Sequence, residues 1–441
     1  MRFFGAALRI LLSRVGQVAA NAAVVVVVAQ TLGPVGQGHY SLTMAAAQLA
    51  SALLACGMGL AAVPPLRQDR VPARRMVTAQ AQWTVAMIVL LLLAAWWTCA
   101  PGPARFLEAN LGWWPGLGFV AAAAAVGLLV YEVFSYDLLA RGRLVVGAAV
   151  NGWRAFGHLA LAAGLASVGA LGFGRAVGAF ALAQVLGATA LVAVLLREIL
   201  RPRRTQPMRA TAADDALPAD LGRRTLRGLM AWNLRRGWVG QLSAVAYFLL
   251  LRLDQGLVAR FQGAAEVGIY SVAVYIGEIL WLLPGAMTPL LIHTSAASAA
   301  DPMRDRTASR AVRIGFLVTL VAAVPLWLVA DPLLALLKDG AYAASGPALR
   351  ALLPGIVAFA PGAVLAGDFI GRGKPHWNTQ ASLLTLAINV GFGLWLIPRH
   401  GAMGAAWASS IAYACGSALM IARFRRATGL TLRSFLRRRR G

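Results

Sequence analysis

Charged residues are scarce in this chain, and acidic residues are the scarcest of them. Only 13% of the 441 residues are charged and only 16 are acidic, whereas soluble proteins carry about 25% charged residues. The three cysteines, Cys56, Cys99 and Cys415, are isolated and lack metal-ligand spacing. We therefore expect no disulfide, no metal site and no cofactor. Together with 59% hydrophobic residues, the shortage of charge indicates an all-α polytopic membrane protein.

The net charge of +25 would suggest a nucleic-acid-binding protein if the chain were soluble. Here the arginines fall between apolar runs, where they are typical of membrane topology, and no nucleic-acid partner is expected.

Twelve apolar spans of about 18–25 residues are predicted, each long enough to cross a hydrocarbon core of ~30 Å. Their approximate positions are 12–31, 40–63, 79–100, 115–138, 146–168, 176–197, 237–261, 268–293, 312–336, 348–370, 378–398 and 402–422.

The basic residues between these spans predict the orientation of the chain. If the N-terminus is cytoplasmic, most of the 41 Lys and Arg residues fall in cytoplasmic segments, and the asymmetry alternates loop by loop. The loops on the other side hold Arg105, Arg175, Lys338, Arg350 and Arg399. We expect a multi-pass membrane protein with both termini in the cytoplasm.

The longest loop divides the chain into two halves. We predict a six-helix N-terminal lobe at 1–197, a basic cytoplasmic linker at 198–236, a six-helix C-terminal lobe at 237–422 and a basic cytoplasmic tail at 423–441. The basic cytoplasmic segments predict contact with anionic lipids. The other loops are short and leave no room for an extramembrane catalytic domain.

Two motifs in the first half recur in the second at nearly the same offset, 230 and 231 residues. Their first copies are Gly33-x4-Gly38-x-Tyr40-Ser41 and Asp137-x3-Arg141-Gly142-Arg143. Their second copies are Gly263-x4-Gly268-x-Tyr270-Ser271 and Asp368-x3-Arg372-Gly373-Lys374. A duplicated unit with an even number of spans is typical of parallel repeats in transporters.

Charges within the seventh and eighth spans are the most informative polar residues. Arg252 and Asp254 are separated by about 200° around a helix, so each needs a partner elsewhere. Arg252 and Glu278 lie about equally far from the turn between their spans, which makes an ion pair at mid-membrane possible. Such a pair either locks two helices together or lines a path for a polar cargo.

These residues resemble those of a known group of transporters. Leu32-Gly33-Pro34-x3-Gly38-x-Tyr40 is similar to the opening motif of polysaccharide-type flippases in the MOP superfamily (multidrug/oligosaccharidyl-lipid/polysaccharide exporters). Arg252-x-Asp254 and Gly371-Arg372-Gly373-Lys374-Pro375 resemble parts of their second half. The resemblance covers nearly the whole chain, although the motifs are degenerate.

The resemblance implies a MATE-like fold of two six-helix lobes around a central cavity. It also implies a non-enzymatic flippase of the bacterial inner membrane that moves undecaprenyl-diphosphate-linked oligosaccharide, a unit of O-antigen or exopolysaccharide, from the cytoplasmic to the periplasmic leaflet. His39-Tyr40-Ser41 and Glu278 depart from the pattern of lipid II flippases and make a peptidoglycan precursor a less favoured cargo. Polysaccharide polymerase or export machinery is an open possibility as a partner.

Cavity residues for such an anionic cargo are predicted from the membrane charges. Arg252 leads, with Arg14 and Arg154 next, because arginine binds phosphate through charge-assisted, bidentate hydrogen bonds. Arg14 could instead be an anchor at the cytoplasmic face. Arg154 is expected to pair with Glu132 across the turn between their spans.

Ion coupling is expected to involve Asp254, since a buried carboxylate can bind a proton or cation; the alternative is a salt bridge to another helix. His158, one turn beyond Arg154, is the weaker candidate for coupling and could be a packing residue. At the cytoplasmic ends of two helices, the pairs Asp137–Arg141 and Asp368–Arg372 are predicted as salt bridges that could act as gates.

Other functions remain open from the sequence. The chain could be a MATE-like exporter of another amphiphile. A membrane glycosyltransferase, acyltransferase or polysaccharide polymerase is less favoured, because the outer loops hold few acidic residues and no nucleophile–base arrangement. A structural protein without transport is the least favoured, because charges inside a membrane are costly.

Overall fold

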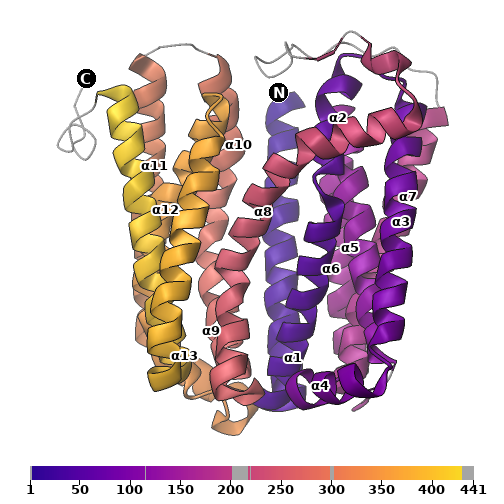
Figure 1. Cartoon of the computed structure of the whole chain (residues 1–441). Coiled ribbons are helices and arrows are strands. Elements are labelled where there is room, and N and C mark those ends of the chain that lie inside the picture. The colour runs from indigo at the N-terminus through magenta and orange to yellow at the C-terminus, as the bar shows by residue number, and fades with distance from the viewer. Residues whose placement is uncertain (1, 115, 201–216, 219, 298–301, 430–441) are drawn as a thin grey trace. The chain divides into compact units, whose positions relative to one another are not determined.

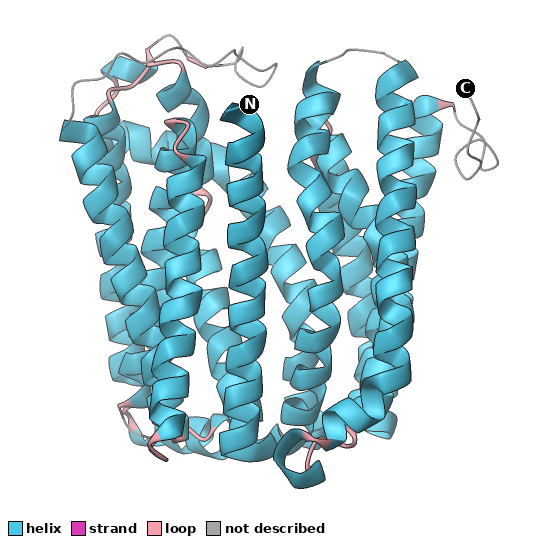
Figure 2. Ribbon diagram, turned by 180° about the vertical axis from the view of Figure 1, so that it is seen from behind, coloured by secondary structure: helices cyan, strands magenta, loops and turns pink. Residues whose placement is uncertain are grey.

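A computed structural model of the chain consists of helices joined by short connections (Figure 1). It describes residues 2–114, 116–200, 217–218, 220–297 and 302–429, and that part of the chain contains no strand (Figure 2). Among the described residues, nine helices are long and apolar enough to cross a membrane. The all-α, multi-pass membrane architecture predicted from composition is confirmed.

The chain forms two compact units. The first contains Met1–Leu32 and His39–Val245, and the second contains Gly33–Gly38 and Ala246–Gly441. Residues 201–216 and 219 of the predicted linker lie outside the described residues, as do residues 430–441 of the predicted basic tail.

Most helices of unit 1 have roughly aligned axes, and the short α4 lies across one end of them (Figure 1). Its elements are α1 (Arg2–Ala55), α2 (Met58–Arg67), α3 (Ala73–Trp97), α4 (Pro101–Leu111), α5 (Leu117–Ala140), α6 (Leu144–Ser167), α7 (Phe173–Leu200), the 3-10 turn η2 (Leu221–Arg223) and the first part of α8 (Leu226–Gln262).

Unit 2 contains the second part of α8 and the helices that follow it. These are α9 (Ala264–Glu278), η3 (Ile279–Trp281), α10 (Leu282–Ala297), α11 (Pro302–Ala335), η4 (Leu337–Gly340), α12 (Ser345–Gly371) and α13 (His376–Thr428).

Two of the helices each hold two predicted spans and bend at a glycine between them. A straight helix of the 53 residues of α13 would be about 80 Å long, far more than a bilayer core needs. The backbone turns at Gly401 in α13 (φ 54°) and at Gly33 in α1 (φ 69°), a region of φ that residues with a Cβ rarely adopt.

The first repeated motif has the same backbone in both copies. Gly33 (φ 69°, ψ −177°) and Gly263 (φ 86°, ψ 178°) share a conformation essentially restricted to glycine. Within unit 2 the two copies cross with their backbones in contact. A Cβ on Gly38 would lie 1.8 Å from the Ala264 carbonyl oxygen, and one on Gly268 would lie 1.9 Å from the Pro34 carbonyl oxygen. Both contacts are related by the same 230-residue offset, which supports the duplication.

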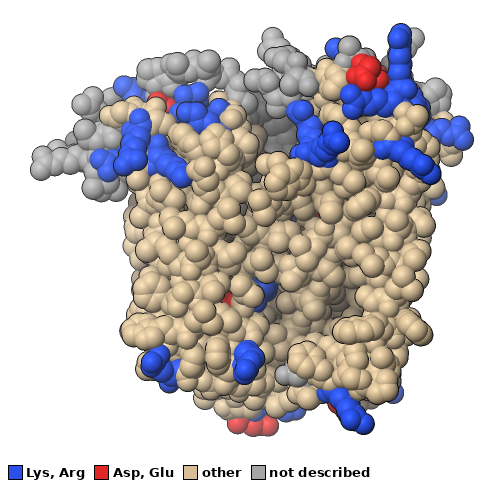
Figure 3. All heavy atoms as spheres, in the orientation of Figure 1, with Lys and Arg blue, Asp and Glu red and all other residues tan. Residues whose placement is uncertain are grey.

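Each unit packs around one central helix. In unit 1 the alanine-rich α5 contributes Ala124, Leu129 and Val133 to the core, and Gly127 allows close approach of the α7 backbone at Gln184. In unit 2 the central helix is α12. In its most apolar stretch 72% of the residues are buried, whereas the corresponding share in α11 is 22%. On the face that Figure 3 shows, Lys and Arg gather toward the helix ends, and the surface between them is almost entirely uncharged.

The α8 helix begins earlier than the predicted span at 237. It starts at Leu226, and the Thr225 hydroxyl accepts a hydrogen bond from the Gly228 amide (3.1 Å), which caps the first turn. Leu229 and Trp232 are buried against Met76 of α3. This packing holds the start of α8 in a stretch that the sequence pattern assigned to the linker.

Candidate functional site

Arg252 and Glu278 form the predicted ion pair in unit 2. The guanidinium Nη1 and Nη2 donate to Glu278 Oε1 and Oε2 at 2.7 and 2.9 Å, a bidentate geometry. The two side chains are only 14% and 19% exposed. The guanidinium also lies 4.9 Å from the centre of the Tyr275 ring. Each Glu278 oxygen accepts one of these hydrogen bonds and keeps a second lone pair, and the pair is close to neutral as a unit.

A break in helical geometry follows Glu278 directly. The α9 helix ends at Glu278, and the 3-10 turn η3 separates it from α10. Pro284 lies in the first turn of α10 and cannot donate a backbone hydrogen bond to the carbonyl one turn earlier, that of Leu280 within η3. The sequence therefore places an interrupted helix beside a buried ion pair, as substrate sites in membrane transporters often do.

Asp254 has no basic partner among the described residues, so the predicted alternative of a salt bridge to another helix is wrong. Its Oδ2 accepts hydrogen bonds from the Tyr270 hydroxyl (2.5 Å) and the Ser409 hydroxyl (3.0 Å), and its Oδ1 accepts one from the Gln255 amide (2.8 Å). Asn389 Nδ2 donates to Ser409 Oγ (3.0 Å), while Asn389 Oδ1 is buried without a hydrogen bond. The result is a buried carboxylate surrounded by neutral oxygen groups.

Of these partners of Asp254, only Tyr270 could have been recognised from the sequence. It is the tyrosine of the first repeated motif, and a tyrosine in an apolar span needs a partner for its hydroxyl. Its counterpart Tyr40 behaves alike in unit 1, where its hydroxyl lies 2.9 Å from His158 Nε2. Ser409 and Asn389 lie far along the chain in α13 and gave no such signal.

In unit 1 the corresponding buried cation is Arg154 of α6, which is 8% exposed. Its Nε and Nη2 donate to Gln184 Oε1 of α7, the Nε bond at 2.7 Å, and its Nη1 donates to Asn151 Oδ1 at 3.2 Å. The guanidinium lies 4.1 Å from the centre of the Tyr131 ring. Gly187, one turn from Gln184, makes room for the Arg154 side chain.

The predicted Arg154–Glu132 pair does not form. Tyr131 faces α6 and its hydroxyl donates to the Gly147 carbonyl (3.1 Å), so Glu132 points about 100° away. There its Oε1 accepts a hydrogen bond from Gln241 Nε2 of α8 (3.0 Å). Arg154 and Glu132 were predicted to pair because they lie at a similar depth, but Glu132 lies on a face of α5 that does not point toward Arg154. Among the described residues, Arg154 therefore has only neutral hydrogen-bond acceptors.

The other predicted residues of unit 1 have different surroundings. Arg14 is exposed on α1. His158 is buried, and its ring centroid lies 5.2 Å from that of Phe180 in addition to its contact with Tyr40. Neither position tests the predicted role in cargo binding or ion coupling.

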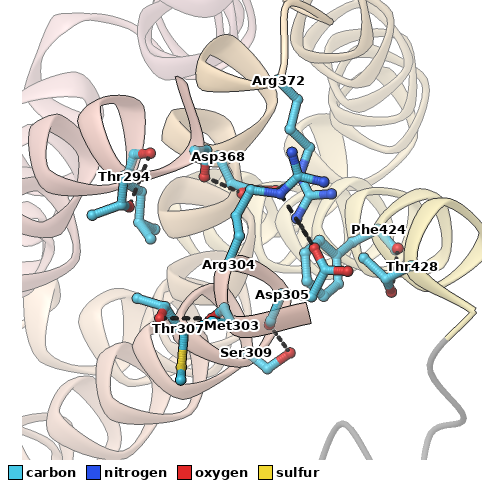
Figure 4. A network of polar contacts seen from close by, with 12 residues as sticks. Thr294, Met303, Arg304, Asp305, Thr307, Ser309, Asp368, Arg372, Phe424 and Thr428 are labelled. Carbon is cyan, nitrogen blue, oxygen red and sulfur yellow. Dashed lines mark hydrogen bonds and ion pairs between the residues drawn. The ribbon is translucent and has the colours of Figure 1, made fainter. Parts of the chain in front are cut away.

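At the end of α12, the predicted Asp368–Arg372 salt bridge is part of a larger network (Figure 4). Arg372 Nε donates to Asp368 Oδ2 (2.5 Å), and Nη2 donates to Asp305 Oδ1 of α11 (2.7 Å). The Ser295 hydroxyl of α10 donates to Asp368 Oδ1 (2.5 Å). Burial disfavours the charged guanidinium, but the bonds to Asp368 and Asp305 outweigh it and raise the pKa of Arg372 above its ordinary value. Three helices are joined here.

At the end of α5, the predicted Asp137–Arg141 salt bridge does not form. Asp137 is fully buried, and neither of its carboxylate oxygens accepts a hydrogen bond. Arg141 Nη1 instead donates to the Glu198 carbonyl at 3.4 Å, and Arg143 pairs with the Glu198 carboxylate at 2.9 Å. Both arginines are bound at the C-terminal end of α7, which has exposed carbonyls and a glutamate.

Comparison with known proteins gives the fold of the chain. No protein-family profile matches it, and no curated protein matches it in sequence. A solved structure of a multidrug resistance MATE family transporter of the MOP superfamily, inward-facing, aligns with a TM-score of 0.70 and 17% identity over 94% of each chain. The lipid II flippase MurJ, in an inward closed conformation, aligns with a TM-score of 0.73 and 11% identity over 98% of this chain and 89% of that one. A MOP superfamily transporter from Pyrococcus furiosus aligns with a TM-score of 0.58 and 15% identity over 96% and 95% of the two chains.

These similarities extend over nearly the whole length of each protein. At such low identity they show that the chain has the fold of MATE and other MOP superfamily transporters, which confirms the predicted MATE-like fold class.

Proposed function

We propose that this protein is a flippase that moves undecaprenyl-diphosphate-linked oligosaccharide, a repeat unit of a surface polysaccharide or exopolysaccharide, from the cytoplasmic to the periplasmic leaflet by alternating access. The proposal rests first on the shared fold, since one protein with this fold is described as a lipid II flippase. It also agrees with the resemblance of the sequence motifs to polysaccharide-type flippases.

The observation that carries the proposal is the environment of Arg154. A buried guanidinium is costly unless an anion or several hydrogen bonds compensate for its lost hydration. Arg154 has neutral amide acceptors and a tyrosine ring, which leave its positive charge without an acidic partner in the described part of the chain. A diphosphate has the charge and the oxygen geometry to complete this site.

Arg252 has a different place in the proposal. Its guanidinium is already bound on two nitrogens by Glu278, so a phosphate would have to compete with that carboxylate. We assign Arg252 and Glu278 to lining the path of the cargo and Arg14 to contact with the cargo or with lipid at the cytoplasmic face.

For coupling, we propose Asp254 as the group that binds a proton or a monovalent cation. Asp254, the Ser409 hydroxyl and the unbonded Asn389 Oδ1 supply oxygen atoms within one buried region. Oxygen ligands of this kind suit hard cations. His158, held by Tyr40, is the second candidate. The predicted partners, anionic lipids and polysaccharide polymerase or export machinery, remain part of this proposal.

Analysis of lipid-linked intermediates in a deletion strain tests the function. We expect undecaprenyl-diphosphate oligosaccharide to accumulate on the cytoplasmic face and the surface polymer to be lost. Complementation with the wild-type chain should reverse both effects, and complementation with Arg154→Gln should not, at equal protein level. Normal polymer without accumulation would overturn the proposal.

A MATE-like exporter of another amphiphile is the second candidate, because two structures with this fold, one inward-facing and one outward-facing, are described as a multidrug resistance MATE family transporter. This function predicts intact polymer in the deletion strain and increased sensitivity to, or retention of, small amphiphiles. The same strain therefore separates the two functions.

A further inference from the structure

Three aromatic side chains from other elements of unit 2 surround Phe359 of α12. Its ring centroid lies 4.9 Å from that of Trp281 in η3, 5.1 Å from that of Tyr413 in α13 and 6.5 Å from that of Tyr247 in α8. The Tyr247 and Phe359 rings are nearly parallel, with 24° between their planes. Trp281 also contacts Tyr413 edge-on at 5.5 Å.

This aromatic cluster is not sealed inside the unit. Tyr247 is 41% exposed, and Trp281 and Phe359 are partly exposed, while Tyr413, which packs against Trp281 and Phe359, is only 3% exposed. A hydrogen bond from Trp281 Nε1 to the Ile356 carbonyl (3.3 Å) fixes the orientation of the indole ring. The cluster therefore offers fixed aromatic faces with one accessible side.

The cluster lies beside the Arg252–Glu278 pair. Trp281 belongs to the 3-10 turn that begins directly after Glu278, and Tyr247 lies on α8 five residues before Arg252. The site thus combines aromatic faces with a carboxylate and a guanidinium that neutralise each other. Few polar groups among aromatic walls are typical of small-molecule binding sites.

We propose that Tyr247, Trp281 and Phe359 form a subsite for a neutral sugar ring of the cargo, with Arg252 and Glu278 as hydrogen-bonding partners of its hydroxyls. This proposal rests on the proposed function and specifies how unit 2 recognises the glycan. A pyranose ring has one face of C–H groups, which packs on an aromatic face, and a rim of hydroxyls, which needs both donors and acceptors. The arrangement provides both kinds of surface.

The charge balance decides between this occupant and others. An organic cation would gain no net charge attraction from the ion pair, because Glu278 has both oxygens bound to Arg252, and it would lie close to the Arg252 cation. A phosphate would need a free guanidinium, and Arg252 offers none without breaking the pair. A neutral, hydroxyl-rich ring can bind without separating the two charges.

Binding to the purified full-length protein in lipid nanodiscs tests the subsite. The two probes are undecaprenyl diphosphate carrying one N-acetylglucosamine and undecaprenyl diphosphate without a sugar. We expect Tyr247→Ala and Trp281→Ala to weaken binding of the first probe about tenfold and to leave binding of the second unchanged. Tyr247→Phe and Trp281→Phe keep an aromatic face and should retain most of the affinity.

Trp395→Ala is the matched control. Trp395 is a 57% exposed tryptophan of the same unit with its own aromatic neighbour, Phe392, at 6.4 Å. The Trp395→Ala substitution should leave the affinity for both probes unchanged. An equal loss for both probes in the Tyr247 and Trp281 variants, or no loss for either, would overturn the sugar subsite while leaving the flippase proposal intact. If the wild-type protein binds neither probe, the proposed function itself fails, and the subsite fails with it.

Discussion

The two copies of the Asp-x3-Arg-Gly motif have the same backbone and different side-chain partners. Gly142 and Gly373 end their helices at φ 70° and 71°, and the next residue, Arg143 or Lys374, donates to the carbonyl five residues earlier at 2.8 Å in both. Yet Asp368 accepts hydrogen bonds from Arg372 and Ser295, whereas Asp137 accepts none. Both copies of the motif thus end a helix in the same way, whereas the neighbouring helices determine which hydrogen bonds the charged side chains form.

The same lesson applies deeper in the two units. Each unit has an arginine deep within a membrane span, but Arg252 has a carboxylate partner and Arg154 has amides and an aromatic ring. The repeated tyrosines also differ, because Tyr270 binds a carboxylate and Tyr40 binds an imidazole. The units share a scaffold but present different chemistry, and the following predictions test that difference.

The largest difference is expected between the two arginines. Arg252→Met leaves the Glu278 carboxylate buried and unpaired, which should lower the free energy of unfolding by about 3–5 kcal/mol. Arg154→Met leaves only neutral groups and should cost about 1–2 kcal/mol. Denaturant titration of both variants in detergent micelles measures the two values. The double variant Arg252→Met/Glu278→Leu should recover most of the loss, and equal costs for the two single variants would refute the comparison.

An alanine substitution at Gly38 and one at Gly268, where the two copies of the first motif cross, should destabilise the protein by similar amounts. Gly38→Ala and Gly268→Ala place a Cβ against a backbone carbonyl that cannot move aside, at an expected cost of about 3 kcal/mol each. Thermal unfolding and the yield of monodisperse protein measure the effect. Gly256→Ala, where a Cβ meets nothing within 4 Å, is the control and should be neutral or slightly stabilising. A crossing that tolerates one alanine but not the other would show that the copies are not equivalent.

The helix-end aspartates should respond differently. Asp368→Asn weakens a charge-assisted network among three helices and should destabilise the protein by about 2 kcal/mol. Asp137→Asn removes a carboxylate without hydrogen bonds, and the stability should stay the same or rise. The difference in unfolding free energy between the two variants is the decisive quantity, and a loss on Asp137→Asn as large as on Asp368→Asn would contradict the structure.

The smallest effects are expected at the repeated tyrosines. Tyr270→Phe removes a hydrogen bond to a carboxylate and should cost about 1.5–2 kcal/mol, whereas Tyr40→Phe removes one to a neutral ring and should cost about 1 kcal/mol. Unfolding of the two variants under identical conditions gives the ranking. A reversed ranking would mean that the Tyr40–His158 contact carries charge.

Much of the fold could be predicted from the sequence because it depends on local patterns. Apolar runs and loop arginines gave the membrane spans and the predicted orientation, and the motif around Gly33 and Gly263 gave the duplication. The Arg252–Glu278 pair was predictable as well, because one short turn fixes the depth of both residues. The Arg154–Glu132 pair was predicted by the same argument and is wrong, since depth alone does not say which face of the helix a residue occupies.

The sequence by itself determined the helices, the interruptions at Gly33, Gly401 and Pro284, and the presence of costly charges within the spans. Hydropathy, the backbone conformations of glycine and the missing backbone N–H of proline act within a few residues. Their effects can therefore be predicted from the sequence alone. Only the tertiary structure decided that Ser409 and Asn389 surround Asp254, that Gln184 binds Arg154 and that Phe359 gathers three other rings. Those contacts join residues far apart along the chain, and they depend on which helix faces pack together, which no local pattern specifies.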